Sequence, residues 1–454
     1  MNALAEPLDR YRRLLNTAAA SLPGRELDWL SRRRALAIKQ FMERGLPSPR
    51  DEAWRYTRLD RLTDQDWSLP QPAPSGPSER AIAELILDPA PAARLVFVNG
   101  RWDAALSDTP RLDEGMRIAS LHQMLEEEPG LIAPWLGLAT DANPSTFTAL
   151  NTALINDGLY LHIPAGAQPS GPIEILYLST GQHAAPHAAP VVNLRNLIVL
   201  GDGASATLVE HYAELGDTSA RFTHSLTEVI LGAQARLEHA RLQDEGPETR
   251  HLSQVHIRQG EASHYQGLGI SLGGLWSRSE YHNRLTQTRA RCELDGLYLA
   301  GDRQLTDVHL DITHAVAASS SREHFKGILS GRGRAVFDGR IRVEVDAQQT
   351  DAHLVNQNLL LSRDAEIDTK PQLEIYADDV KCSHGTTVGQ LDPAQLFYLR
   401  ARGIDAEAAR RLLCLGFALE VMERCSVPGL RARVEQRLDQ KLAQVPPTET
   451  LQTQ

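Results

Sequence analysis

The spacing of hydrophobic residues divides the chain into three parts. In residues 1–68, apolar side chains recur at intervals of three and four, which predicts helices. From Leu95 to Tyr376 the pattern changes to short runs in which apolar and polar residues alternate, which predicts β-strands. After Pro393 the helical spacing returns and continues to Leu442. The pattern therefore predicts a β core between two helical regions.

A strand unit repeats through the middle of the chain. An alanine marks each copy, and these alanines are Ala204, Ala233, Ala262, Ala290, Ala335 and Ala365. They differ by 29, 29, 28, 45 and 30 residues, so most copies keep a step near 29 and we expect an insertion in the long interval. This step favours a β-solenoid over a β-propeller, whose blades use roughly 40 or more residues. Stacked aliphatic coils would also explain the low aromatic content of 5%.

Composition shifts place the boundaries between the parts. Prolines at positions 70, 72, 74 and 77 are typical of a semi-rigid, exposed connector. Asp405 and Pro428 are residues expected at the starts of two C-terminal helices. The predicted division is a helical region at 1–68, a proline-rich linker at 69–94, a β-solenoid core at 95–390, a helical domain at 391–443 and a flexible tail at 444–454.

Charge and short motifs exclude several classes of function. The chain carries 47 basic and 58 acidic residues, a net charge of −11, which argues against general binding to nucleic acid or to an anionic membrane. Any anion site would have to be local. The sequence lacks GxxxxGK[ST], and its two GxG pairs, at 201–203 and 267–269, lead into strands without a third glycine, so we expect no ATP site. Because no apolar leader or 18-residue apolar stretch is present, the expected location is the cytoplasm.

Cysteine usage points to a reducing compartment, and any metal site would have to be shared with another chain. The four cysteines, Cys292, Cys382, Cys414 and Cys425, show no CxxC spacing that would indicate a zinc site or a self-contained iron–sulfur site. Cys382 and His384 lie two residues apart, so in extended chain they face the same side. Thiolate and imidazole both bind iron, but this pair supplies at most two ligands. On spacing alone, a buried cysteine beside a turn histidine is the favoured interpretation.

Three further polar runs favour structural explanations over catalysis. Asp307, His309 and Asp311 share one strand face and could bind a divalent ion, but alternation alone predicts a solvent-facing strand there. The run at 319–326 combines serines with a histidine and a lysine but lacks a GxSxG motif, so we expect a loop. The amides at 356–358 are expected to form hydrogen bonds between stacked turns.

Residues 347–404 closely resemble the SufB/SufD family of iron–sulfur cluster assembly scaffolds. The resemblance extends to REHFKGIL at 322–329, VFDGRIRV at 336–343 and the helix at 406–425, and so covers most of the chain. The segment DEAWRYTRL at 51–59 resembles the SufD branch, and the multi-cysteine motif of some SufB members is missing. The resemblance implies a right-handed parallel β-helix flanked by helical N- and C-terminal regions, in agreement with the 29-residue step.

The resemblance also implies partners. A family member of this branch would be a non-catalytic scaffold that pairs with SufB through the β-helix and binds the ATPase SufC through its C-terminal helices. It would hold no cofactor alone, while iron or a nascent iron–sulfur cluster would bind transiently at the subunit interface. Matched by position, His384 and, with weaker support, Cys382 would lie at that interface. The residues matched to the ATPase contact are Phe397, Tyr398, Arg400 and Arg402.

Two other functions compete with this one at the level of sequence. A β-helix enzyme acting on a polysaccharide would display Asp, Arg and Lys along one face of the coils, but it would usually carry a secretion signal, which this sequence lacks. A purely structural homodimer would also cover the open edges of such a helix.

Overall fold

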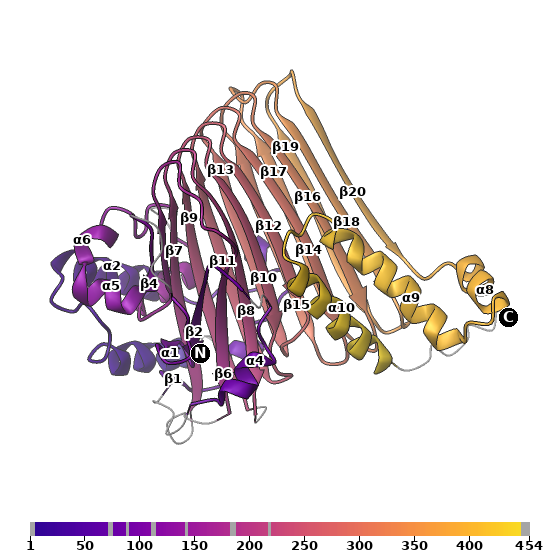
Figure 1. The fold of residues 1–454 in the computed structure, drawn as a ribbon, viewed down its shortest axis with the longest axis horizontal. Helices are drawn as coiled ribbons and strands as arrows, with labels where there is room; N and C mark the ends of the chain where they lie inside the picture. The colour runs from indigo at the N-terminus through magenta and orange to yellow at the C-terminus, as the bar shows by residue number, and fades with distance from the viewer. Residues whose placement is uncertain are drawn as a thin grey trace.

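The fold is a parallel β-solenoid with helices on both of its outer faces (Figure 1). The computed structural model describes residues 5–70, 76–87, 90–109, 115–140, 144–181, 188–216 and 219–445. The chain is mainly β, and from β7 onward it alternates between two sheets, so each coil of the solenoid gives one strand to each sheet. The predicted fold class is confirmed.

We call the two sheets sheet I and sheet II. Sheet I contains β1 (Trp67–Ser68), β4 (Arg117–Ser120), β5 (Leu159–Ile163), β7 (Ala189–Leu200), β9 (Arg221–Leu231), β11 (Thr249–Gln259), β13 (Trp276–Leu285), β15 (Leu305–His314), β17 (Arg334–Val343) and β19 (Glu366–Ile375). Sheet II contains β3 (Arg101–Trp102), β2 (Ala93–Val98), β6 (Ile173–Thr180), β8 (Ser205–Leu215), β10 (Arg236–Asp244), β12 (His264–Ser271), β14 (Arg291–Ala300), β16 (Ser320–Leu329), β18 (Asp351–Leu360) and β20 (Lys381–Gly389). Only the pairs β2–β3 and β4–β5 are antiparallel among the paired strands of the described residues.

A column of small buried residues marks the corner before each sheet II strand. Strand register aligns Ala204, Ala235, Ser263, Ala290, Ser319 and Thr350. The residue before each has a positive φ, and these are Gly203, Gln234, Ala262, Arg289, Ala318 and Gln349. A compact side chain fits because the chain reverses there into the next strand.

This register corrects the sequence interpretation of the repeat. Of the six marker alanines, Ala204 and Ala290 belong to the corner column, while Ala233 and Ala262 precede column positions by two residues and by one. Ala335 and Ala365 lie elsewhere, at sheet I strands β17 and β19. From Ala290 the column continues to Ser319, 29 residues later. The interval of 45 residues therefore contains no insertion; the alanine series moves from one side of the coil to the other.

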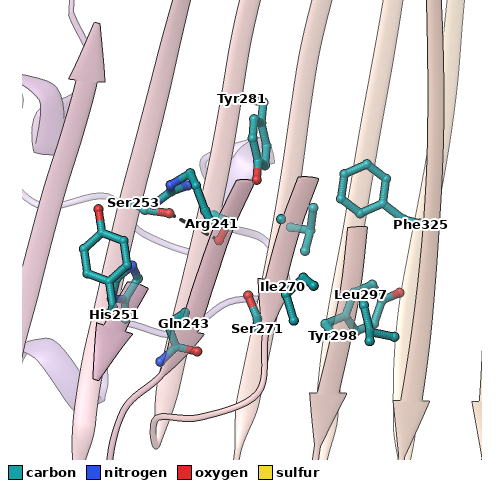
Figure 2. Close-up of a pocket in the computed structure, with 14 residues that line it drawn as sticks. Arg241, Gln243, His251, Ser253, Ile270, Ser271, Tyr281, Leu297, Tyr298 and Phe325 are labelled. Carbon is teal, nitrogen blue, oxygen red and sulfur yellow. Dashed lines mark hydrogen bonds between the residues drawn. The ribbon is translucent and has the colours of Figure 1, made fainter. Parts of the chain in front are cut away.

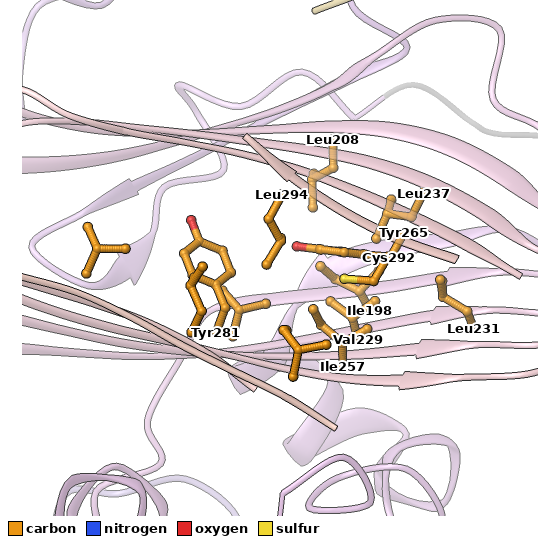
Figure 3. Packing of buried hydrophobic residues seen from close by; sticks show 14 of the residues in the cluster. Ile198, Leu208, Val229, Leu231, Leu237, Ile257, Tyr265, Tyr281, Cys292 and Leu294 are labelled. Atoms are coloured by element: carbon orange, nitrogen blue, oxygen red, sulfur yellow. The ribbon is translucent and has the colours of Figure 1, made fainter. Parts of the chain in front are cut away.

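The space between the sheets holds the main hydrophobic core. Leu237, Leu294 and Ile257 meet there from both sheets, with the rings of Tyr265 and Tyr281 among them (Figure 3). A Cβ on Gly269 would lie 2.2 Å from the hydroxyl oxygen of Tyr281. The glycines at 267–269 therefore make room for aromatic rings, and this explains a GxG pair that leads into no phosphate site.

Helices cover the outer faces of the sheets. The chain contains α1 (Ala5–Ala18), α2 (Asp28–Arg44), η1 (Glu52–Trp54), α3 (Asp60–Thr63), α4 (Glu79–Ala83), α5 (Leu121–Glu127), α6 (Pro129–Ile132), α7 (Thr146–Ala153), α8 (Pro393–Ala401), α9 (Ala406–Leu419), η2 (Glu420–Met422) and α10 (Pro428–Ala443). Helices α1, α2, α5, α6 and α7 pack on the early strands of sheet I. Helix α4 packs on the early strands of sheet II, and α9 and α10 pack on later strands of the same sheet (Figure 1). No helix in the described ranges is long and apolar enough to cross a membrane.

Some predicted segments have additional structure. Helices α5 to α7 lie inside the range 95–390, where we expected strands alone, and they cover apolar residues of β7 and β9 such as Leu197 and Ile230. Helix α4 and the start of β2 lie in the predicted linker at 69–94. Within that linker, residues 71–75 and 88–89 are outside the described residues, as are residues 446–454 of the predicted tail.

Candidate partner-binding surfaces

The solenoid is open at its C-terminal end. Strands β19 and β20 are the last strands of their sheets, so each has a strand neighbour on one side only. None of the nine residues of β20, all of them described, is buried. Apolar side chains are exposed here, among them Ile375, Tyr376 and Val388. A free strand edge beside exposed core residues is a surface that another chain can cover.

Cys382 and His384 lie at this open end. Register places Cys382 beside Ala352 and His384 beside Leu354, so both belong to the face of β20 that continues the core. His384 is exposed, whereas Cys382 is half-buried against the core. Burial and the charge of Asp351 raise the pKa of the Cys382 thiol, although a backbone hydrogen bond at Ala352 opposes the shift.

Metal binding by this end needs ligands from elsewhere. The described residues contain no group of three or more His, Cys, Asp or Glu side chains that could hold a metal ion. Because Cys382 favours the protonated thiol, the exposed imidazole of His384 is the more available ligand. The two residues can contribute to a metal site but cannot complete one.

Helix α8 carries a second exposed surface. Asp392 caps its N-terminus by accepting a hydrogen bond from the Ala394 amide at 2.8 Å. No residue of this fully described helix is buried, and Phe397 and Tyr398 are 74% and 55% exposed. The Arg402 guanidinium lies 4.5 Å from the centre of the Tyr398 ring. Arg400 and Arg402 are also exposed, so two aromatic rings and two guanidinium groups share this surface.

Ion pairs hold the C-terminal helices on sheet II. Lys326, which is buried, pairs with Glu420. Arg424 pairs with Asp295 at 2.5 Å and with Glu293 at 3.1 Å. These contacts connect η2 and the residues after it to β14 and β16, close to the open end. A force applied to α8 and α9 would therefore reach the solenoid.

The run at 319–326 is part of β16, so the expectation of a loop is wrong for all of it except Ser319. Ser319 and Ser321 are buried on either side of His314, with Oγ atoms 2.8 Å from Nδ1 and 3.1 Å from Nε2. Burial lowers the pKa of His314 to about 4. A neutral imidazole held between two hydroxyl groups serves packing.

Asp307 also differs from the expectation of a solvent-facing strand. It is fully buried, because the segment at 51–57 crosses the outer face of β15. Thr57 donates a hydrogen bond to Asp307 at 2.5 Å, and Arg278 forms an ion pair with it at 2.5 Å. The Arg278 guanidinium lies 3.9 Å from the centre of the Trp54 ring. The acidic strand face therefore anchors the N-terminal segment.

The interior of the solenoid contains a small polar cavity. Arg241 and Tyr281 point into the same space between the sheets (Figure 2). Burial opposes ionisation of the neighbouring Glu210, but hydrogen bonding from His239 and the charges of His239 and Arg241 lower its pKa to about 2. The cavity holds about 10 Å³, which is room for roughly one water molecule. This network stabilises the core and is too small to hold a substrate.

The amides at 356–358 have a structural role. Asn358 donates to Asn356 at 2.7 Å, and Asn356 donates to the Tyr298 hydroxyl at 3.0 Å. Longer contacts of 3.4 Å reach the carbonyl groups of Phe325 and Thr387 on the adjoining strands. The amides therefore connect stacked coils, as the sequence predicted.

Two protein-family models together match most of the chain. The family model "SUF system FeS cluster assembly, SufBD core domain" matches residues 183–417, and the model "SufBD protein N-terminal region" matches residues 6–175. The chain is 33% identical to iron-sulfur cluster assembly protein SufD of Escherichia coli over 89% of this chain and 91% of that protein. It is 32% identical to an iron-sulfur cluster assembly SufBD family protein of Synechocystis over 92% of each chain. It is 24% identical to SufD of Bacillus subtilis over 91% of this chain and 94% of that protein.

Proposed function

Because the chain belongs to the SufB/SufD family of the SUF iron–sulfur cluster assembly system, we propose that it is a non-catalytic scaffold subunit that pairs with a SufB-type chain and binds a SufC-type ATPase. The observation that carries the proposal is the open end of the solenoid. The core ends in the half-buried strand β19 and the exposed strand β20, and a second solenoid would cover both.

The cluster would form where the two solenoids meet. His384 and Cys382 lie on the core-facing side of β20, so a partner that continues the sheet brings its own side chains next to them. This chain then supplies one or two ligands to iron, its transient cargo, and the partner supplies the rest. The four free cysteines suit a reducing cytoplasm as the place of this work.

The ATPase would bind helix α8. Phe397, Tyr398 and Arg402 offer the aromatic and arginine side chains that dominate protein interfaces. Closure of the ATPase would pull on α8 and α9, and the ion pairs of Lys326 and Arg424 would carry this motion to β14 and β16. The interface near His384 would then change shape during each ATP cycle.

Co-expression with the two candidate partners tests the proposal. We expect a stable complex of all three proteins with ATPase activity. Val388→Asp should abolish binding to the SufB-type chain, and a Phe397→Ala, Tyr398→Ala double variant should abolish binding to the ATPase alone. Leu36→Asp, on the exposed face of α2, is the matched control and should bind both. Failure of the wild-type chain to bind either partner would overturn the proposal.

Replacing His384 separates the metal role from assembly of the complex. His384→Ala should leave the three-protein complex intact and lower its yield of iron–sulfur cluster, because His384 is exposed and its loss removes no packing. An undiminished cluster yield would contradict a ligand role for this histidine. If the chain dimerises with itself through β20 and ignores the SufB-type partner, the structural homodimer is the correct function.

A further inference from the structure

A groove of about 520 Å³ lies on the outer face of sheet I, beyond the edge of the N-terminal helices. Its floor is formed by β11, β13, β15 and β17, and residues 138–140 form one wall. The Gly137 and Ala139 amides donate to the two carboxylate oxygens of Glu228 at 2.8 and 3.1 Å, which fixes this wall in place. The groove is on the side of the solenoid away from the C-terminal helices, and at one end Arg342 adjoins Tyr376 of the open end.

Parallel pairing concentrates arginines on the floor of the groove. Ile257 pairs with Asn283, so the residues that follow them, Arg258 and Arg284, lie side by side. Arg284 pairs with Thr313, and Thr313 with Arg342, so the same row crosses four strands. Neighbouring strands are roughly 4.8 Å apart, so Arg258 and Arg284 are adjacent, while Arg258 and Arg342 stand about 14 Å apart at the two ends of the row, a span that the long arginine side chains and an extended ligand can bridge.

Carboxylates neutralise only part of this charge. Arg340 binds Asp311 at 2.8 Å, and Arg284 binds Glu344 at 2.9 Å. Arg342 lies 4.0 Å from its nearest carboxylate, on Glu374, and its Nε atom is buried without a hydrogen-bond partner in the described residues. Arg258 is exposed and has no ion pair or hydrogen bond of its side chain within those residues. Arg258 therefore remains available to an anion, and Arg342, whose guanidinium lies 5.5 Å from the centre of the Tyr376 ring, has no carboxylate closer than 4.0 Å among the described residues.

A buried histidine adds a second unsatisfied group. His256 is only 5% exposed, yet it lines the groove, and its Nε2 has no hydrogen-bond partner in the described part of the chain. Its ring stacks on His282 with centres 4.6 Å apart and planes 13° apart. A buried polar nitrogen without a partner is costly, and an oxygen of a bound ligand would satisfy it.

We propose that this groove binds a small molecule with more than one phosphate group, whose phosphates are held by Arg258 and Arg342 while the rest of the molecule lies against His256 and His282. Guanidinium groups match phosphate oxygens in a two-pronged geometry. The volume is that of ordinary small-molecule sites. Arginine side chains on the strands would hold the phosphate here, as backbone amides of a glycine-rich loop do in nucleotide-binding proteins. Phosphate binding at this groove therefore does not require a GxxxxGK[ST] motif.

Titration calorimetry of the full-length chain with pyrophosphate at constant ionic strength tests this site. We expect saturable binding to the wild-type protein. An Arg258→Gln, Arg342→Gln double variant should bind pyrophosphate at least tenfold more weakly, and His256→Phe, which keeps the ring stack, should also weaken binding. Arg334→Gln is the control, because Arg334 lies on β17 outside the groove and pairs with Glu366.

Thermal unfolding of each variant establishes that it is folded before binding is measured. Inorganic phosphate that competes with pyrophosphate in the wild-type protein, and not in the double variant, would support recognition of the phosphate group itself. Absence of saturable binding at millimolar pyrophosphate would overturn the proposal. Equal affinity of the wild-type protein and the double variant would overturn it as well. Neither partner protein is present, so this result is independent of the proposed scaffold function.

Discussion

Strands β9 and β20 occupy opposite environments in the same architecture. Every residue of β9 is buried, because sheet II covers one face and the N-terminal helices cover the other. No residue of β20 is buried, because the coils end there and the outer face carries no helix. Both strands are regular and parallel, so backbone geometry does not explain the difference. The difference lies in what covers each strand, and the uncovered last coil leaves a surface that another chain could cover.

The largest effect should come from truncating a core side chain in the covered coils. Phe325→Ala removes a buried ring between the sheets, and we expect it to lower the free energy of unfolding by about 3–5 kcal/mol. Val388→Ala at the open end should cost less than about 1 kcal/mol in the isolated chain, because the Val388 side chain already meets water. Urea unfolding of both variants measures the contrast. Equal losses would mean that the last coil is packed as tightly as the middle.

Asp307 and Asp311 lie on the same strand, β15, but Asp307 is buried and Asp311 is partly exposed. Asp307→Ala leaves the guanidinium of Arg278 buried with one anion fewer, so we expect a loss of about 3 kcal/mol. Asp311→Ala removes a partly exposed ion pair with Arg340 and should cost less than about 1 kcal/mol. Thermal or urea unfolding compares them. A small effect of Asp307→Ala would show that residues 51–57 do not need this anchor.

A buried acid makes the covered coils sensitive to pH. Glu323 on β16 is fully buried, and burial raises its pKa to about 8, although hydrogen bonding from Ser321 and from a backbone amide opposes the shift. The folded chain therefore binds a proton that the unfolded chain has released above its ordinary pKa of 4.5, and this contribution to stability declines as pH rises toward 8.

Glu323→Gln should remove that decline. Between pH 6 and 8 we expect the free energy of unfolding of the wild-type protein to fall by about 2–3 kcal/mol more than that of the variant, at roughly 1.4 kcal/mol per pH unit. Glu366→Gln, on exposed β19, is the control and should keep the wild-type slope. Urea unfolding at several pH values gives both slopes. Parallel slopes for wild type and Glu323→Gln would contradict a buried neutral acid.

The fold was predictable because its signals are local and repeated. Alternating apolar residues and a step near 29 identify a solenoid without knowledge of any long-range contact. The burial of Asp307 was not predictable from its own strand, because it depends on a segment 250 residues earlier in the chain. The helices α5 to α7 were missed for a similar reason, since the broad strand pattern hid three short helical segments. The local pattern of apolar and polar residues cannot show which strand faces are buried by segments that are distant in the sequence.

For the candidate site too, local sequence predicted some features and long-range structure added the others. The positions of His384 and Phe397 came from a family resemblance, and the structure adds that both are exposed at places where the chain lacks cover. Their roles stay predictions until a partner is bound. The arginine groove was invisible in the sequence, because Arg258, Arg284 and Arg342 are separated by 26 and 58 residues and only strand register unites them. The sequence could say only that an anion site must be local.

The smallest predicted effect concerns the residues with positive φ that precede the corner column, which occur both in the covered coils and beside the last coil. Gln234 and Gln349 have φ values of 57° and 60°, one in the covered coils and one beside the last coil, and both are exposed. Replacing either residue by Gly removes left-handed backbone strain of roughly 1 kcal/mol. Part of this gain in stability is offset, because glycine has more conformational freedom in the unfolded chain. We expect a net gain of about 0.5 kcal/mol in urea unfolding for each. Because the strain is local, the two gains should be equal even though burial differs so strongly between the coils. A gain at Gln234 without one at Gln349 would mean that the last coil already unfolds separately, before the covered coils do.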